Sequence, residues 1–143
     1  KRLKIAGPAT DLRHLGYDKV PDHVELVGYV GPEERAKLLS RAQCLMAPTH
    51  YLEPFGNIVA EAQFCGTPVI TTDWGGFVDS VVPGVTGYRC KDFKSFVEAA
   101  STIHQLDPQN CRDWAMQSFS DEVVHNKFDA WLQKIIRKDF YYV

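Results

Sequence analysis

Residues 44–72 read CLMAPTHYLEPFGNIVAEAQFCGTPVITT, and they predict a strand, a helix and a second strand in that order. The apolar run Cys44–Ala47 is the first strand candidate, and the loop Pro48–Phe55 follows it. A helix is expected from about Gly56 to Phe64, and Pro68–Thr71 is the next strand. Short apolar strands that alternate with a helix are typical of a parallel sheet buried on both faces.

The same alternation continues on both sides of this segment. The other expected strands are Leu3–Ala6, His23–Val27 and Thr86–Arg89, and the other expected helices begin at Gly31-Pro32-Glu33-Glu34 and cover Phe77–Val82, 92–106, 108–118 and 121–138. The pattern predicts a Rossmann-like, doubly wound parallel α/β sheet followed by C-terminal helices. We expect one domain over residues 1–143, with its core in 1–106 and a helical segment in 107–143.

The composition is that of an ordinary soluble domain. The chain has 143 residues, 45% of them hydrophobic and 24% charged, and 16 Lys and Arg balance 18 Asp and Glu. This balance argues against a protein that holds nucleic acid by bulk charge. No apolar run approaches the roughly 18 residues of a membrane span. The four cysteines lack zinc-site spacing and fall mostly in apolar runs, so we expect buried thiols and a cytoplasmic location.

The last predicted helix carries one apolar stripe at spacings of three and four: Val124, Phe128, Trp131, Leu132, Ile135 and Ile136. Its basic neighbours also fit a helix lying on a membrane surface, namely Lys134, Arg137 and Lys138. Four acidic residues offset that charge: Asp121, Glu122, Asp129 and Asp139. We therefore favour packing against protein, with the aromatic tail 140–143 contributing to it.

The ligand site is expected where the loop 48–55 enters the next helix. Ligands of open parallel sheets gather beyond the carboxyl ends of the strands, and a helix N-terminus offers free amides to an anion. No Lys or Arg occurs between Arg41 and Arg89, so a phosphate there would depend on amides or on cations from elsewhere. Glu53 precedes the helix, and Glu61 lies one turn after Asn57 on the same helical face.

Glu53 and Glu61 can also be interpreted as residues without a functional role. Two Glu residues eight positions apart are common by chance, and Glu61 alone also fits a solvated helix position. Against this, the neighbours of Glu61 are apolar or small, and a carboxylate on a mostly buried helix needs a partner. A ribose with its vicinal hydroxyls would be such a partner. We interpret His50 as an exposed loop residue rather than as a contact to a sugar hydroxyl, and we assign no role to the other histidines.

The segment Glu53-Pro-Phe-Gly-Asn-Ile-Val-Ala-Glu61 resembles the Glu-x-Phe-Gly-x-x-x-x-Glu signature of retaining glycosyltransferases of family four, which have the GT-B fold. Further blocks resemble the family in order and spacing over residues 2–138: Val24–Val30, Gly66–Ile70, Asp73–Gly76 and Pro83–Tyr88. The resemblance implies the C-terminal, nucleotide-sugar-binding half of such an enzyme, which transfers a hexosyl group to a glycan, lipid or other acceptor.

The resemblance also implies residue roles. Glu53 would contact the transferred sugar near the reacting carbon, and Glu61 would bind the donor ribose. Backbone groups of Val30 would meet the base. The amides of Phe55, Gly56, Asn57 and Ile58 would touch the sugar and the diphosphate. No obligatory metal or other cofactor is implied.

The chain departs from the family pattern in three respects. The family has an Arg and a Lys near the end of an earlier strand, whereas this sequence begins at what resembles the second strand. The N-terminal acceptor domain is not in these residues, so we expect them to be inactive alone. Asp79 stands where the family most often has Glu. The alternatives are a phosphorylase or epimerase relative, an inactive GT-B-type binding module, and a generic flavodoxin-like domain.

Overall fold

The computed structural model describes residues 1–8, 11–13 and 16–137. The chain divides into two compact units, residues 1–38 and 39–143. The first unit holds a two-stranded parallel sheet of β1 (Leu3–Ala6) and β2 (Val24–Gly28). Helix α1 (Pro32–Ser40) begins at a proline with two acidic residues in its first turn, which suits a helix N-terminus.

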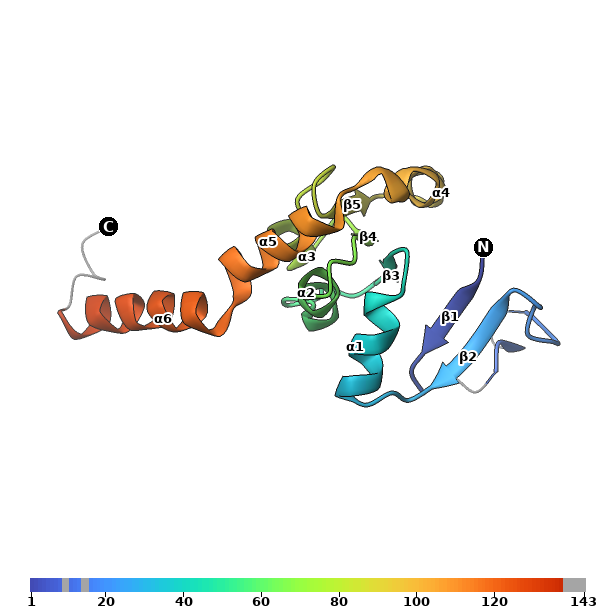
Figure 1. The fold of residues 1–143 in the computed structure, drawn as a ribbon, viewed down its shortest axis with the longest axis horizontal. Coiled ribbons are helices and arrows are strands. Elements are labelled where there is room, and N and C mark those ends of the chain that lie inside the picture. Colours follow the sequence, from blue (N-terminus) through green and yellow to red (C-terminus); the bar gives the residue numbers. More distant parts are fainter. Residues whose placement is uncertain (9–10, 14–15, 138–143) are drawn as a thin grey trace. The chain divides into compact units, whose positions relative to one another are not determined.

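The second unit is built on a three-stranded parallel sheet in the order β3–β4–β5. Its strands are Leu45–Ala47, Val69–Thr72 and Gly87–Cys90. Its helices are α2 (Asn57–Phe64), α3 (Phe77–Ser80), α4 (Phe93–Thr102), α5 (Pro108–Phe119) and α6 (Asp121–Ile136), with a short 3-10 helix at Ile103–Gln105 (Figure 1). The expected parallel α/β architecture is confirmed.

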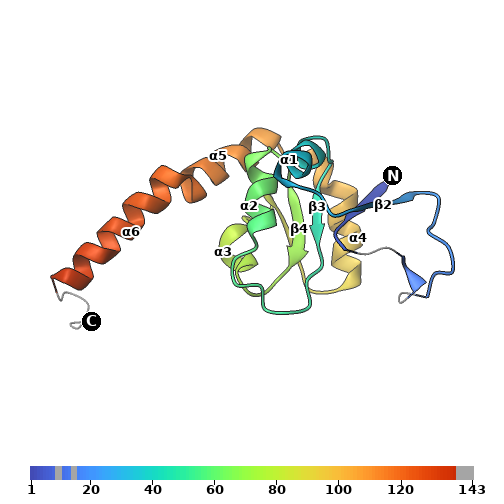
Figure 2. The same ribbon diagram turned by 90° about the horizontal axis from the view of Figure 1, so that it is seen from below.

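Helices cover both faces of this sheet (Figure 2). Successive residues of β4 point to opposite faces. Val69 joins a core with Val59 and Ala62 of α2 and Phe77 of α3, whereas Ile70 joins a second core with Ala99 of α4 and Ile103. Because β4 is buried on both faces, its four residues are all apolar or small and polar, as the sequence indicated.

Helix α6 forms where the sequence predicts it, but its apolar stripe is not a core. No residue of α6 is buried, and Val124, Phe128 and Trp131 are 50%, 56% and 46% exposed. Its contacts with α5 leave most of the stripe in solvent. Within the described residues, no helix combines the length and the hydropathy needed to cross a membrane. The aromatic tail 140–143 and Lys138 lie outside the described residues.

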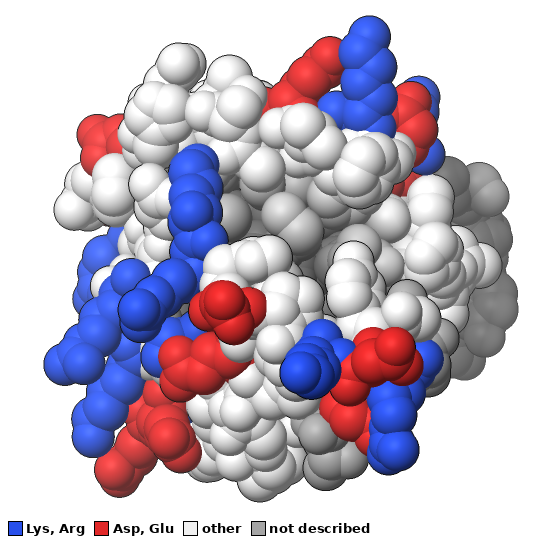
Figure 3. Space-filling model, turned by 90° about the vertical axis from the view of Figure 1, so that its right-hand side faces the viewer, with Lys and Arg blue, Asp and Glu red and all other residues white. Residues whose placement is uncertain are grey.

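The surface charges are mixed in sign. On the face shown in Figure 3, Lys and Arg side chains lie beside Asp and Glu side chains. Lys4 and Glu25 form an ion pair, with the Lys4 Nζ and Glu25 Oε2 atoms 3.0 Å apart. This interleaving fits the balanced composition, which argued against binding by bulk charge.

Candidate functional site

The loop between β3 and α2 is held in place by the last residue of β4 and by the loop that follows it. The Thr72 hydroxyl donates to the Thr49 carbonyl at 3.0 Å, and the Trp74 indole N–H donates to the Tyr51 carbonyl at 3.2 Å. The Gly76 N–H donates to the Glu53 carbonyl at 2.6 Å. Both loops follow the carboxyl ends of neighbouring parallel strands, so the sheet brings them together at the edge where a ligand was expected.

The Glu53 carboxylate is half-buried and accepts hydrogen bonds on both of its oxygens. The Gly56 N–H donates to Oε1 at 3.0 Å, and the Tyr51 hydroxyl donates to Oε2 at 2.7 Å. The hydrogen bond to Glu53 and the negative charge of that carboxylate raise the pKa of Tyr51 above its ordinary 10.0. Tyr51 therefore keeps its proton at neutral pH and remains a donor.

Helix α2 begins with amides that face the loop. Its N-cap, Gly56, has φ +83°, and a Cβ there would lie 2.6 Å from Cε1 of Phe77, so glycine is required on both counts. The N–H groups of Asn57 and Ile58 have no acceptor inside the helix, as is usual for a first turn. These two amides and the helix dipole can receive an anion. The Gly56 amide is directed to Glu53 instead.

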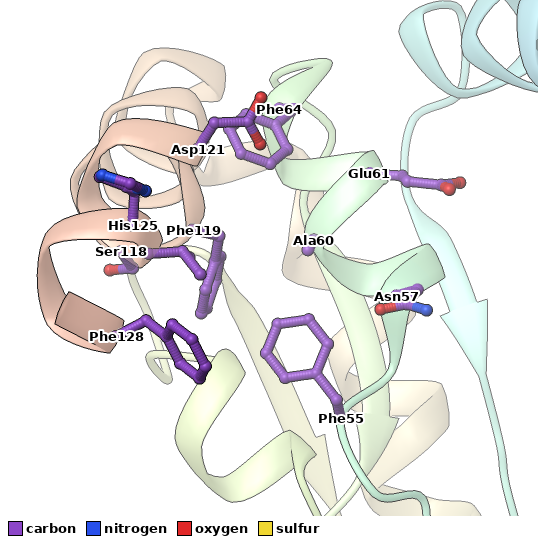
Figure 4. Close-up of a pocket in the computed structure, with 11 residues that line it drawn as sticks. Phe55, Asn57, Ala60, Glu61, Phe64, Ser118, Phe119, Asp121, His125 and Phe128 are labelled. Carbon is purple, nitrogen blue, oxygen red and sulfur yellow. The ribbon is translucent and has the colours of Figure 1, made fainter. Parts of the chain in front are cut away.

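Asn57 and Glu61 lie on the same side of α2, as their spacing predicted (Figure 4). In that view Glu61 points away from α6, and the rings of Phe55, Phe119 and Phe128 lie on the opposite side of the helix. Glu61 is half-buried although its neighbours Ala60 and Ala62 are buried. Glu61 is thus only partly shielded from solvent, on the face of α2 that it shares with Asn57.

A hollow lies between α2 and the junction of α5 with α6. Four phenylalanines contribute to its lining, and the rings of two of them, Phe55 and Phe119, meet edge to face with centroids 5.3 Å apart. Asn57 and Glu61 contribute to its rim, but the Glu61 side chain is turned away from its aromatic floor (Figure 4). The hollow is therefore distinct in character from the polar end of the loop at Glu53.

Val30 belongs to the first unit. It follows β2 and is 7% exposed, so its side chain is part of the core and only its backbone groups are suited to contact a ligand. Glu53, Phe55, Gly56, Asn57, Ile58 and Glu61 all belong to the second unit, where one loop and one helix bring them together.

The remaining candidates have simpler environments. His50 is exposed in the loop, and His14 lies outside the described residues. Among the residues described, no group of three or more His, Cys, Asp or Glu side chains is arranged to hold a metal ion. Cys90 and Cys111 are buried, as expected, whereas Cys44 and Cys65 are only half-buried; burial raises the pKa of the Cys111 thiol to about 11.

Sequence reasoning missed Tyr51 and assigned no definite role to Trp74. Trp74 is half-buried and holds the backbone of the loop, and Tyr51 holds the carboxylate. Tyr51 stands two positions before Glu53, and this proximity in the sequence could have suggested a contact between them. Its direction is set by the loop conformation, which the spacing of residues does not give.

Comparison with known proteins connects these residues to one family. Residues 1–105 match the family model described as "Glycosyl transferases group 1". The chain is similar to the glycogen synthase of Mycobacterium tuberculosis, at 38% identity over 93 residues, which cover 62% of this chain and 22% of that protein. It is also similar to the D-inositol 3-phosphate glycosyltransferase of Mycolicibacterium smegmatis, at 41% identity over 85 residues, covering 58% and 19%. The chain thus spans about a fifth of these curated relatives.

Solved structures share the fold. A structure of Anabaena HepE in complex with UDP-glucose superposes with a TM-score of 0.72 at 20% identity, covering 93% of this chain and 41% of that one. Sucrose-phosphate synthase from Thermosynechococcus elongatus gives a TM-score of 0.71 at 27% identity, covering 89% and 33%. The expected Rossmann-like α/β fold is confirmed by its match to these structures.

Proposed function

The chain belongs to the family of group 1 glycosyl transferases, and from that premise we propose that it is the donor-binding, C-terminal half of a retaining enzyme of glycosyltransferase family four. The donor is a nucleotide diphosphate sugar, and the group transferred is a hexose. The acceptor, a glycan, a lipid or another molecule, is held by an N-terminal domain of the same protein. The observation that carries the proposal is the placement of Glu53 and Glu61 around the start of α2, within the part that matches the family model.

The proposed donor pose follows the axis of α2. The diphosphate lies at the amides of Asn57 and Ile58, where the helix dipole favours negative charge. Glu61 lies one turn further along and accepts two hydrogen bonds from the vicinal ribose hydroxyls. Backbone groups of Val30 receive the base.

Glu53 faces the transferred sugar in this pose. Its carboxylate accepts hydrogen bonds from the sugar hydroxyls near the anomeric carbon and stabilises positive charge that develops there. The leaving diphosphate is stabilised by the start of α2 and by cations of the complete protein, without an obligatory metal. Transfer retains the anomeric configuration. The exposed apolar stripe of α6 is a surface that fits contact with the N-terminal domain.

Binding of nucleoside diphosphates to single-residue variants tests the proposal. Glu61→Ala is expected to weaken binding about tenfold, since it removes charge-assisted hydrogen bonds to the ribose, and Glu53→Ala is expected to weaken it less. The dissociation constants are measured by calorimetry or NMR for UDP, GDP and ADP. Glu98→Ala, which removes an exposed carboxylate from α4, is the matched control and should bind as the wild type does.

Two results would decide against this assignment. Equal affinities of the wild type and Glu61→Ala would remove Glu61 from the ribose site. The second result has two parts: nucleotide affinity is unchanged in Glu53→Ala and Glu61→Ala, and the complete protein transfers no sugar. Together they would favour the alternative of a catalytically inactive GT-B-type binding module.

A further inference from the structure

The Glu53 carboxylate accepts a hydrogen bond from Tyr51, a side chain that the proposed donor pose does not use. We propose that Tyr51 is a positioning residue, whose hydroxyl fixes the Glu53 carboxylate in the direction that transfer requires. The inference rests on the proposed role of Glu53 toward the transferred sugar.

The two hydrogen bonds on Glu53 determine the plane of its carboxylate. The terminal torsion of a Glu side chain is broad, so one donor alone leaves the group free to turn. Here the Gly56 N–H holds Oε1 at 3.0 Å and the Tyr51 hydroxyl holds Oε2 at 2.7 Å. Donors on different oxygens and from different residues fix the position of both. Each oxygen keeps a second lone pair, which is available to a sugar hydroxyl.

Tyr51 is itself placed by the neighbouring loop. The Trp74 indole N–H donates to its carbonyl at 3.2 Å, and the Gly76 N–H donates to the carbonyl of Glu53 at 2.6 Å. The backbone on both sides of Leu52 is therefore tied to the loop after β4. The hydroxyl of Tyr51 thus donates to Glu53 from a residue whose backbone is held by hydrogen bonds.

The exposure of Tyr51 separates positioning from packing. Tyr51 is 65% exposed, so its ring contributes little to the core, and its removal should leave the fold intact. The interaction that Tyr51→Phe deletes is the hydrogen bond to Glu53. The raised pKa of Tyr51 has this same contact as its main cause, which makes the contact measurable in solution.

The first measurement titrates Tyr51 in this chain. Carbon-13 NMR of the tyrosine Cζ follows the phenol, with Tyr51→Phe identifying the resonance. The pKa of Tyr51 should lie above 10.0 in the wild type and fall toward 10.0 in Glu53→Gln. A Tyr51 pKa that is the same in both proteins would overturn the inference.

The second measurement follows transfer by the complete protein. Tyr51→Phe should lower kcat about tenfold with little change in the KM of the donor, because the carboxylate is misdirected while donor binding persists. In the Glu53→Gln background the same substitution should change kcat less than twofold, since the group that it positions has gone. Tyr17→Phe alters another half-exposed tyrosine, 51% exposed, and should behave as the wild type.

The outcomes separate this inference from the proposed function. If Glu53→Gln lowers kcat and Tyr51→Phe does not, the positioning role is wrong and the function stands. An equal loss from Tyr51→Phe with and without the Glu53 carboxylate would also refute positioning. If Glu53→Gln leaves transfer unchanged, the proposed role of Glu53 is wrong, and the inference falls with it.

Discussion

At the scale of single residues, the site depends on a close approach of two backbones at Gly76. A Cβ at this position would lie 2.5 Å from the Pro54 carbonyl oxygen and 2.6 Å from Cα of Phe55. These are backbone atoms, so a side chain cannot be accommodated by a change of rotamer. Gly76 thus permits the hydrogen bond that its own N–H donates to Glu53.

We expect Gly76→Ala to lower the free energy of unfolding by about 1–3 kcal/mol, since the loops must separate to admit the methyl group. Urea unfolding of the two proteins measures the difference. Gly31→Ala is the control, because a Cβ at Gly31 meets nothing within 4 Å. Its effect should stay below about 1 kcal/mol, as expected for a change at the start of α1. Equal free energies of unfolding for Gly76→Ala and the wild type would show that Gly76 does not lie close to the backbone of Pro54 and Phe55 in solution.

The sequence predicted the location of Glu53 and Glu61 but not their contacts. The order of strand, loop and helix places Glu53 just before α2 and Glu61 one turn into it, and the spacing of four between Asn57 and Glu61 gives a common face. The partners of Glu53 come from Tyr51 and from the left-handed turn at Gly56. Side-chain direction in a loop depends on tertiary contacts with the segment after β4, which residue spacing does not encode.

At the scale of elements, α4 is fixed by a capping box. The Asp92 side chain accepts from the Ser95 N–H at 2.8 Å, and the Ser95 hydroxyl oxygen accepts from the Asp92 N–H at 3.2 Å. The hydrogen bonds from Ser95 lower the pKa of Asp92 below its ordinary 3.8. A carboxyl whose pKa is lowered by folding stabilises the native state above pH 3.8, and this contribution is lost as the pH falls through the folded pKa.

Asp92→Ala should therefore have a lower melting temperature than the wild type at pH 7. The difference between the two melting temperatures should decrease as the pH falls below 3.8. Asp92→Asn keeps a good N-cap without a titrating group, so it should stay close to the wild type at pH 7. Thermal unfolding followed by circular dichroism at several pH values measures both variants. A difference in melting temperature between Asp92→Ala and the wild type that does not change with pH would contradict a stabilising effect of the ionised Asp92 carboxylate.

Element boundaries differ from the predicted ones by one or two residues, for local reasons. The predicted strand Thr86–Arg89 is observed as Gly87–Cys90, and Thr86 instead uses its hydroxyl to accept from the Val82 N–H. Helix α3 ends at Ser80 because Val81 is extended, with φ −116° and ψ 119°. The predicted helix 92–106 divides into α4 and a 3-10 turn. Apolar periodicity locates such elements well, but their last residues depend on single hydrogen bonds.

At the scale of the whole molecule, the apolar stripe of α6 is the part that periodicity explains least. Its spacing of three and four predicts a buried face, yet Phe128 and Ile136 are 56% and 71% exposed. Periodicity reports that a face is apolar, not which surface covers it. The division into two units was likewise absent from the sequence pattern, which ran as one series of strands and helices. Both features depend on contacts between distant segments.

Mapping nucleotide binding onto the chain tests whether the loop before α2 and the first turns of α2 bind a nucleotide-sugar donor. Amide spectra of the labelled chain are recorded while UDP, GDP or ADP is added into the millimolar range, which allows for weak binding. If the chain binds the donor as proposed, the shifts cluster at Val30, at the amides of Phe55–Ile58 and at Glu61, with one base preferred. Shifts confined to the aromatic hollow around Phe119 and Phe128, or an unchanged spectrum with every nucleotide, would contradict donor binding by this chain.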